Sequence, residues 1–247
     1  MAAGFWTSLA RPRVFARVTR WMLPLLLTAG GGLLVAGIWQ AFIVSPPDYQ
    51  QGETVRIMYI HVPAATISMG LYVSMAIAAA VSLIWRHMLA DLFCRAAALP
   101  GAVLTLICLV TGSLWGLPTW GTWWVWDARL TSVLILFFLY LGYIGLADAF
   151  DRPERGEQAG AILLLVGVIN IPVIRFSVDW WNSIHQPASI IRKGGISIDP
   201  SMLIPLGLMF GAVACLAGAL ILIRMEAEIL RRRIAAREAR LAQMGEA

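Results

Sequence analysis

The feature that most constrains this fold is a set of six apolar stretches, each of about twenty residues, that hold almost no charge. A helix needs roughly 20 apolar residues to cross about 30 Å of hydrocarbon, so each stretch is long enough to span a membrane. Five contain no Asp, Glu, Lys or Arg, and the other contains only Arg175, close to its end. The stretches are 21–44, 62–85, 96–115, 130–147, 159–178 and 202–223. The sequence therefore predicts an all-α integral membrane protein with six transmembrane helices.

Composition agrees with a membrane class. Hydrophobic residues make up 60% of the chain and charged residues 13%, and the mean hydropathy is +0.77, unlike a soluble globular domain. The formal charge of +5 comes from basic residues that are scattered over juxtamembrane segments, where they suit anionic lipid headgroups. They form no continuous basic patch, so we expect contact with the lipid bilayer and no nucleic-acid binding.

Charge also predicts the orientation. An even number of spans places both termini on one side, and the side richer in Lys and Arg is normally the cytoplasm. Fourteen of the nineteen basic residues lie before the first span, after the second, fourth and sixth spans, and therefore on one side. The five on the other side are Arg56, Arg129, Arg175, Arg192 and Lys193. We expect a single transmembrane domain over 1–247, with both termini cytoplasmic and a charged cytoplasmic tail at 224–247.

The segments predicted to lie outside hold seven of the eleven tryptophans and two of the three histidines. The densest is the loop 115–132, carried by short outer helices or loops, in which five tryptophans are followed by Asp127 and Arg129. These five are Trp115, Trp120, Trp123, Trp124 and Trp126. This concentration indicates that the function lies at the outer face.

Four residues of this loop share one face if the chain is helical there, since they recur at i, i+3, i+4 and i+7: Trp120, Trp123, Trp124 and Asp127. Indole rings on one face form a flat shelf on which a planar ligand can stack. The alternative is an interfacial aromatic belt, but a belt spreads its tryptophans over many helix ends. On this hypothesis Asp127 faces the ligand, and its replacement should affect ligand transfer more than folding.

Two histidines lie on the same predicted side as the tryptophans. His61 lies in IHVPAA and His185 in IHQPAS, and in each case proline follows the histidine by two positions. Because proline fits the first turn of a helix, Pro63 and Pro187 place both imidazoles at helix entrances near the outer interface. An interfacial histidine is often only a polar anchor, and this alternative stays open for each residue taken alone.

A metal with only two histidine ligands beside a planar aromatic surface suggests a macrocycle that supplies four further donors. Haem fits, because neutral imidazole is a common axial ligand of haem iron. Zinc or copper would be expected to recruit further Cys, His or carboxylate ligands. Arg56 and Arg129 are candidates for binding the two propionates by charge and position.

The run WGTWWVWDARLTS, with its core at Trp120 to Asp127, resembles the WWD signature of the haem-handling proteins of cytochrome c maturation. Six spans and outer histidines at His61 and His185 resemble specifically the CcmC branch, the haem exporter protein C family. The resemblance covers nearly the whole chain. It implies that haem b is held transiently at the periplasmic face of the bacterial inner membrane, with the two histidines as axial ligands and the loop against the porphyrin.

The resemblance also implies partners. Haem would pass to the haem chaperone CcmE, with CcmD as a small companion and CcmA and CcmB as an ATP-driven release machine. The chain has no G-x-x-x-x-G-K-[ST] phosphate loop, so any ATP would be hydrolysed by a partner and we expect no enzyme activity here.

Two other functions compete with this interpretation. The first is a cytochrome b-type electron-transfer protein with a permanently bound bis-histidine haem, although such histidines typically lie within spans. The second is a small-molecule transporter that grips an aromatic substrate, although transport sites usually lie near the bilayer midplane at broken helices or intramembrane charges.

Overall fold

The computed structural model describes residues 12–186 and 195–245, and in that part of the chain the regular elements are helices. Six helical segments are long and apolar enough to cross a membrane, which confirms the predicted all-α fold with six potential spans. Two short elements differ from α-helices, since η1 is a π-helix and η2 a 3-10 helix. In chain order the elements are α2 (Pro12–Trp39), η1 (Gln40–Val44), η2 (Glu53–Ile57), α3 (Met58–Trp85), α4 (Met88–Trp120), α5 (Ala128–Asp148), α6 (Pro153–Gly167), α7 (Asn170–Trp180) and α8 (Pro200–Gly245).

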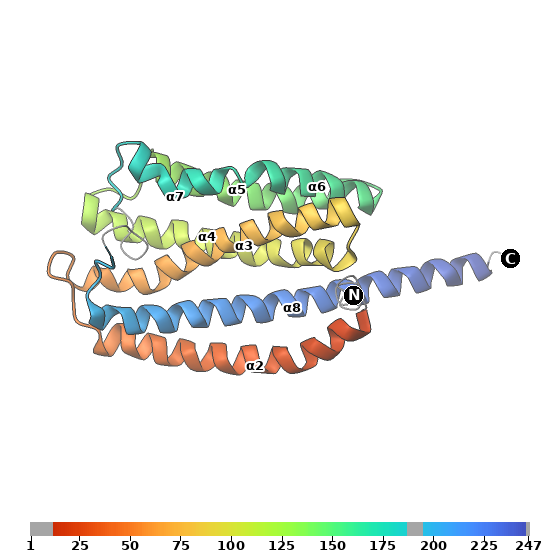
Figure 1. Cartoon of the computed structure of the whole chain (residues 1–247), viewed down its shortest axis with the longest axis horizontal. Coiled ribbons are helices and arrows are strands. Elements are labelled where there is room, and N and C mark those ends of the chain that lie inside the picture. The colour runs from red at the N-terminus through yellow and green to blue at the C-terminus, as the bar shows by residue number, and fades with distance from the viewer. Residues whose placement is uncertain (1–11, 187–194, 246–247) are drawn as a thin grey trace.

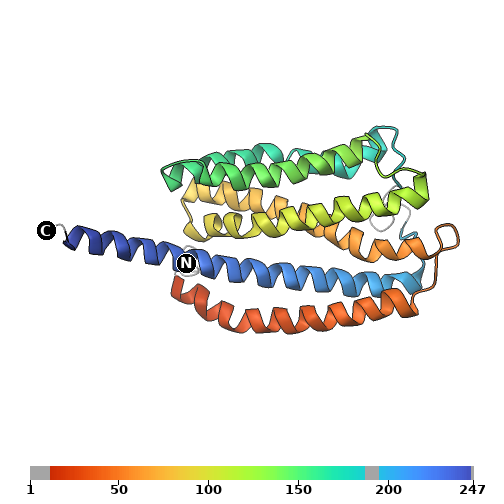
Figure 2. The same cartoon turned by 180° about the vertical axis from the view of Figure 1, so that it is seen from behind.

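The helices lie side by side with their long axes roughly aligned (Figure 1). α2 forms one edge of the bundle and packs mainly on α8, which in turn contacts α3 and α4. α5, α6 and α7 lie on the other side of α3 and α4, and the view from behind shows the same order (Figure 2). The start of α2 and the C-terminal part of α8 lie at the same end of the bundle, as an even number of spans requires.

The centre of the bundle is built from small residues and tyrosines. Tyr72 and Tyr140 are fully buried and meet edge to face, with ring centroids 5.1 Å apart. The Tyr140 hydroxyl donates a hydrogen bond of 2.7 Å to the Ser68 carbonyl, so its polar group is satisfied inside the bundle. Tyr140 also occupies the space that a side chain at Gly101 would need, so glycine allows α4 and α5 to approach closely here.

The helix bounds differ from the predicted spans in two informative places. The stretch 159–178 is not one continuous helix, because α6 ends at Gly167 and α7 begins at Asn170. Pro172 has no N–H to donate to the carbonyl of Val168, so the helix is interrupted there. α8, in contrast, continues past the apolar stretch to Gly245 and extends beyond the other helices (Figure 1), so the charged tail is helical up to that residue.

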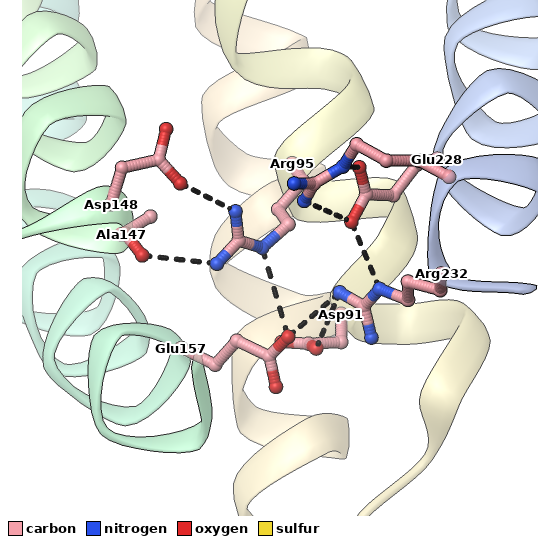
Figure 3. A network of polar contacts seen from close by, with 8 residues as sticks. Asp91, Arg95, Ala147, Asp148, Glu157, Glu228 and Arg232 are labelled. Atoms are coloured by element: carbon pink, nitrogen blue, oxygen red, sulfur yellow. Dashed lines mark hydrogen bonds and ion pairs between the residues drawn. The ribbon is translucent and has the colours of Figure 1, made fainter. Parts of the chain in front are cut away.

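Ion pairs tie this extension to the bundle at the end where α2 begins (Figure 3). Arg95 of α4 donates to Asp148 at 2.8 Å and to the Ala147 carbonyl at 3.0 Å, which joins α4 to the end of α5. Arg232 of α8 donates to Glu157 of α6 at 2.7 Å. The network thus connects four helices at the end of the bundle opposite to His61 and His185. The side chains that complete it are Asp91, Glu228 and Arg231.

Candidate functional site

The two outer histidines lie at one end of the bundle, which we call the histidine end. It is formed by the start of α3, the ends of α4 and α7, the start of α5 and the loops between them (Figure 1). His61 lies in the first part of α3, three residues after its start at Met58, rather than before the helix as predicted. The 3-10 helix η2 runs directly into α3, so helical structure begins earlier than Pro63 indicates.

Three residues on one face of α4 surround the His61 ring. The Nδ1 atom of His61 lies 3.1 Å from the Thr111 hydroxyl. A Cβ atom at Gly112 would lie 3.0 Å from His61 Cε1, so glycine makes room for the ring. Trp115 meets the imidazole edge to face, with centroids 5.8 Å apart and planes at 78°. Trp115 is itself held, because its indole N–H donates a 2.7 Å hydrogen bond to the Gln51 side chain.

The predicted aromatic shelf from Trp120 to Asp127 is wrong. α4 ends at Trp120, Gly121 adopts a left-handed conformation with φ of 75°, and the chain is not helical again until α5 begins at Ala128. Left-handed glycine is a common helix stop, because it lets the chain leave the helix axis without a Cβ clash. Periodicity within 120–127 therefore does not describe which tryptophans share a surface.

The tryptophans of the loop instead have different neighbours and different exposure to solvent. Trp120 lies beside His185, with ring centroids 5.9 Å apart, and packs over Gly116. Trp124 meets Trp126 edge to face at 5.5 Å, and the Trp124 indole N–H is buried without a hydrogen-bond partner among the residues that the structure describes. Trp126 is 74% exposed. The structure thus pairs Trp115 with His61 and Trp120 with His185.

Trp123 lies apart from both histidines. It is 52% exposed and lines an apolar groove of about 320 Å³ on α4. The other lining residues are Leu109, Val110, Ser113 and Leu114. Helical spacing places these on the side of α4 that turns away from the face holding His61.

Asp127 has a structural role that the loop interpretation missed. It is the N-cap of α5, where its Oδ1 atom accepts a 2.8 Å hydrogen bond from the Leu130 N–H. Its other carboxylate oxygen accepts a hydrogen bond from the Ser183 hydroxyl. Ser183 Oγ in turn accepts from the backbone N–H of His185 at 3.1 Å. Asp127 therefore ties the start of α5 to the segment that carries His185, which is a structural role besides the one expected from the loop.

Arg129 is bound to the same segment. Its guanidinium lies 3.3 Å from His185 Nδ1, 3.3 Å from the Ser177 hydroxyl and 3.4 Å from the Gln186 carbonyl. The Arg175 carbonyl is a further acceptor at 3.4 Å. Arg129 thus lies next to one histidine, but its hydrogen-bonding groups are largely engaged by protein atoms.

Arg56 also has protein partners. It forms an ion pair with Glu53, one turn earlier in η2, and donates to the Ala41 carbonyl. Its side chain is 15% exposed, whereas that of Glu53 is 68% exposed. Exchange of Glu53 for another anion at Arg56 costs little free energy, because ion pairs that are partly open to solvent contribute only about 0–1 kcal/mol to stability.

The protein environment favours neutral imidazole at His185. Burial lowers its pKa below the usual 6.5, the Gln186 carbonyl raises it, and the Arg129 charge lowers it further. His61 lies within electrostatic range of both His185 and Arg129. Among the residues that the structure describes, no cluster of three or more His, Cys, Asp or Glu side chains could hold a metal ion.

Several residues of this site were not predicted. Thr111, Gly112 and Gln51 contact the His61–Trp115 pair from positions with no sequence signal of their own. The sequence did contain a signal for the cap of α5, because Asp127 lies three residues before the apolar run that begins at Leu130, and Asp is a typical residue at a helix start. Pro187, predicted to open a helix after His185, lies outside the described residues, as do Arg192 and Lys193.

Comparison with known proteins gives a consistent result. Residues 5–240 match the family model described as Heme exporter protein C. A protein of that name from Bradyrhizobium diazoefficiens is 54% identical over 226 residues, covering 92% of this chain and 86% of the relative. The Escherichia coli K12 protein of the same name is 48% identical over 219 residues, covering 89% and 88%. The one from Paracoccus denitrificans is 41% identical over 232 residues, covering 94% and 96%.

Proposed function

The chain belongs to the heme exporter protein C family, and from that premise we propose that it binds haem at the periplasmic face of the bacterial inner membrane and presents it to the haem chaperone CcmE. Membership makes it a haem-handling membrane subunit of cytochrome c maturation rather than a catalytic enzyme. Its partners on this proposal are CcmA, CcmB and CcmD, with ATP hydrolysis in a partner subunit. The excess of basic residues at the opposite end of the bundle supports placing the histidine end in the periplasm.

The observation that carries the proposal is the pairing of each histidine with a tryptophan at one end of the bundle. His61 contacts Trp115 and His185 contacts Trp120, and both histidines have a hydrogen-bond partner at Nδ1. A partner at Nδ1 leaves Nε2 as the atom for the iron, which is the usual arrangement of a metal-binding histidine. On this proposal the iron of haem b is bound by His61 and His185.

The remaining residues support a flat ligand with acidic groups. Trp115 and Trp120 offer indole surfaces beside the imidazoles, and Trp124 offers a buried N–H without a protein partner. Arg56 and Arg129 supply positive charge for the propionates, by exchanging protein acceptors for carboxylates. The haem itself supplies the iron and the vinyl group by which the chaperone would be loaded. Exposed Trp123 and Trp126 would contact the haem edge or the chaperone.

The location of the histidines also bears on the electron-transfer alternative. Both lie at the histidine end, and His185 lies in the non-helical segment 181–186 that follows α7. A permanent cofactor is usually enclosed between helices, whereas cargo must be able to leave. The site therefore favours a haem that is handed on.

The test is to purify the protein with and without the chaperone and to record absorption spectra of bound haem. We expect a bis-histidine spectrum in the wild type and loss of haem or of one axial ligand in His61→Ala and His185→Ala. His87→Ala is a matched control, because His87 lies between α3 and α4 at the opposite end. Wild-type spectra and normal cytochrome c formation in both variants would refute axial ligation. A haem that stays bound and cycles reversibly with quinone would support electron transfer instead.

A further inference from the structure

The hydrogen-bond partners of the two histidines differ in a way that determines which ring nitrogen carries the proton. Neutral imidazole has one N–H donor and one lone pair, and only the nitrogen with the lone pair can bind a metal. The tautomer of each histidine follows from counting the protons available to its partners.

At His61 the count has a single solution. The Thr111 hydroxyl has one proton. Its oxygen lies 2.6 Å from the Ile107 carbonyl oxygen and 3.3 Å from the Cys108 carbonyl oxygen, compared with 3.1 Å from His61 Nδ1. The short contact commits that proton to a carbonyl, so Thr111 can only accept from His61. Nδ1 must then carry the imidazole proton, and Nε2 has the lone pair.

Packing holds the His61 ring in this orientation. Gly112 and Trp115 contact the ring from the same face of α4 that carries Thr111. His61 therefore presents Nε2 before any ligand arrives.

At His185 the partners of Nδ1 conflict. The Gln186 carbonyl, at 3.0 Å, requires an N–H there, whereas the Arg129 guanidinium, at 3.3 Å, is a donor only and requires a lone pair. The first arrangement leaves the Nε2 lone pair available. The second places the proton on Nε2 and prevents it from binding a metal. Both partners contact the same nitrogen, so a small shift of Arg129 selects which tautomer His185 adopts.

We propose that Thr111 is the positioning residue that holds His61 as the permanent axial ligand, and that His185, contested by Gln186 and Arg129, is the ligand that exchanges when haem leaves. The proposal rests on the proposed function, in which both histidines bind the iron. It adds an order to release, since His185 detaches first. Imidazole exchange of this kind transfers one proton between the two ring nitrogens and changes no redox state.

The first test needs no haem. The chain has only three histidines, so nitrogen NMR of the ¹⁵N-histidine-labelled full chain resolves each tautomer after assignment with His87→Ala and His185→Ala. We expect His61 to be entirely the Nδ1–H form in the wild type and in Thr111→Ser, which keeps the hydroxyl. Thr111→Val should give a mixture. Thr105→Val is the matched control, because Thr105 makes the same type of bond to Gly101 on α4, at 2.7 Å. An unchanged His61 tautomer in Thr111→Val would overturn the role of Thr111.

The second test measures haem. Loss of an outer hydrogen bond to a metal-binding histidine typically weakens metal binding by about 10–100-fold, so we expect Thr111→Val to release haem to apomyoglobin at least about tenfold faster. Its midpoint potential should rise, because an imidazole without a Nδ1–H acceptor donates less charge to the iron. Thr111→Ser and Thr105→Val should stay within about twofold of the wild type.

Order of release is tested with the two alanine variants. His185→Ala should retain haem and take up added imidazole at the open position, whereas His61→Ala should lose haem faster. Equal loss, or faster loss from His185→Ala, would overturn the assignment of the exchangeable ligand. If neither variant alters the haem spectrum, the proposed function fails, while the tautomer measurement on the haem-free chain still decides the role of Thr111.

Discussion

Replacing Gly112 with alanine would place a methyl group against the His61 ring. The added Cβ would lie 3.0 Å from His61 Cε1 and 3.5 Å from Nδ1. Carbon atoms in favourable contact are about 3.5–4.0 Å apart, so the ring must move by about 0.5 Å. Movement away from α4 lengthens the 3.1 Å contact with Thr111 to roughly 3.6 Å, which is no longer a hydrogen bond.

The cost in free energy follows from the close contact with the ring and from the lost hydrogen bond to Thr111. Overpacking of a filled site costs about 1–3 kcal/mol, and a lost hydrogen bond costs about 1 kcal/mol. An effect of about 2 kcal/mol on haem binding corresponds to a roughly thirtyfold weaker affinity. Alanine is also a better helix former than glycine by about 1 kcal/mol, so the free energy of unfolding should change less than the affinity.

Haem titration of the purified chain, followed by absorbance, measures the affinity, and thermal unfolding of the haem-free protein measures the stability. Gly70→Ala is the matched control, because a Cβ at Gly70 of α3 meets nothing within 4 Å. Wild-type affinity in Gly112→Ala would refute the placement of the His61 ring against α4.

Three other substitutions or conditions test the surroundings of the site. Asp127→Ala should lower the melting temperature through a loss of about 1 kcal/mol, as is typical for an N-cap, and Asp127→Asn should recover part of it; equal melting temperatures would contradict the capping role. Because the folded-state pKa of His185 is lowered below 6.5, its neutral form stabilises the fold above that pH, and this contribution should be lost as the pH falls below about 6.5. Replacement of His185 by alanine should flatten that part of the profile of melting temperature against pH. Glu157→Gln removes the negative charge that pairs with Arg232 at 2.7 Å and should speed tryptic cleavage of the α8 extension up to about fivefold, whereas Glu238→Gln, at an exposed position, should not.

The two histidines are held by different kinds of structure. His61 lies within α3 and contacts three residues of α4, two helices that pack along much of their length. His185 lies in a loop whose position depends on hydrogen bonds from Asp127, through Ser183, and on Arg129. On the proposed function, this difference suits a protein that orients a haem and then releases it.

Hydropathy and composition alone predicted the six spans, and the structure confirms them, because the ability to cross a membrane is a property of about twenty consecutive residues. The WWD resemblance led to the correct family for a similar reason, since the motif is a local run of residues. The helical tail is likewise compatible with local signals, and so is the non-helical stretch 121–127 of the Trp-rich loop, where Gly121 ends α4.

The arrangement of the site depends on contacts that no local pattern contains. Thr111 and His61 are 50 residues apart in the chain, and Arg129 and His185 are 56 apart. Whether two such residues meet depends on the rotation and depth at which α3, α4 and α5 pack, and on where the chain leaves each helix. The pairing of Trp115 with His61, the cap at Asp127 and the opposed partners of His185 were therefore decided by tertiary structure, because helix packing brings together side chains that are distant in the sequence.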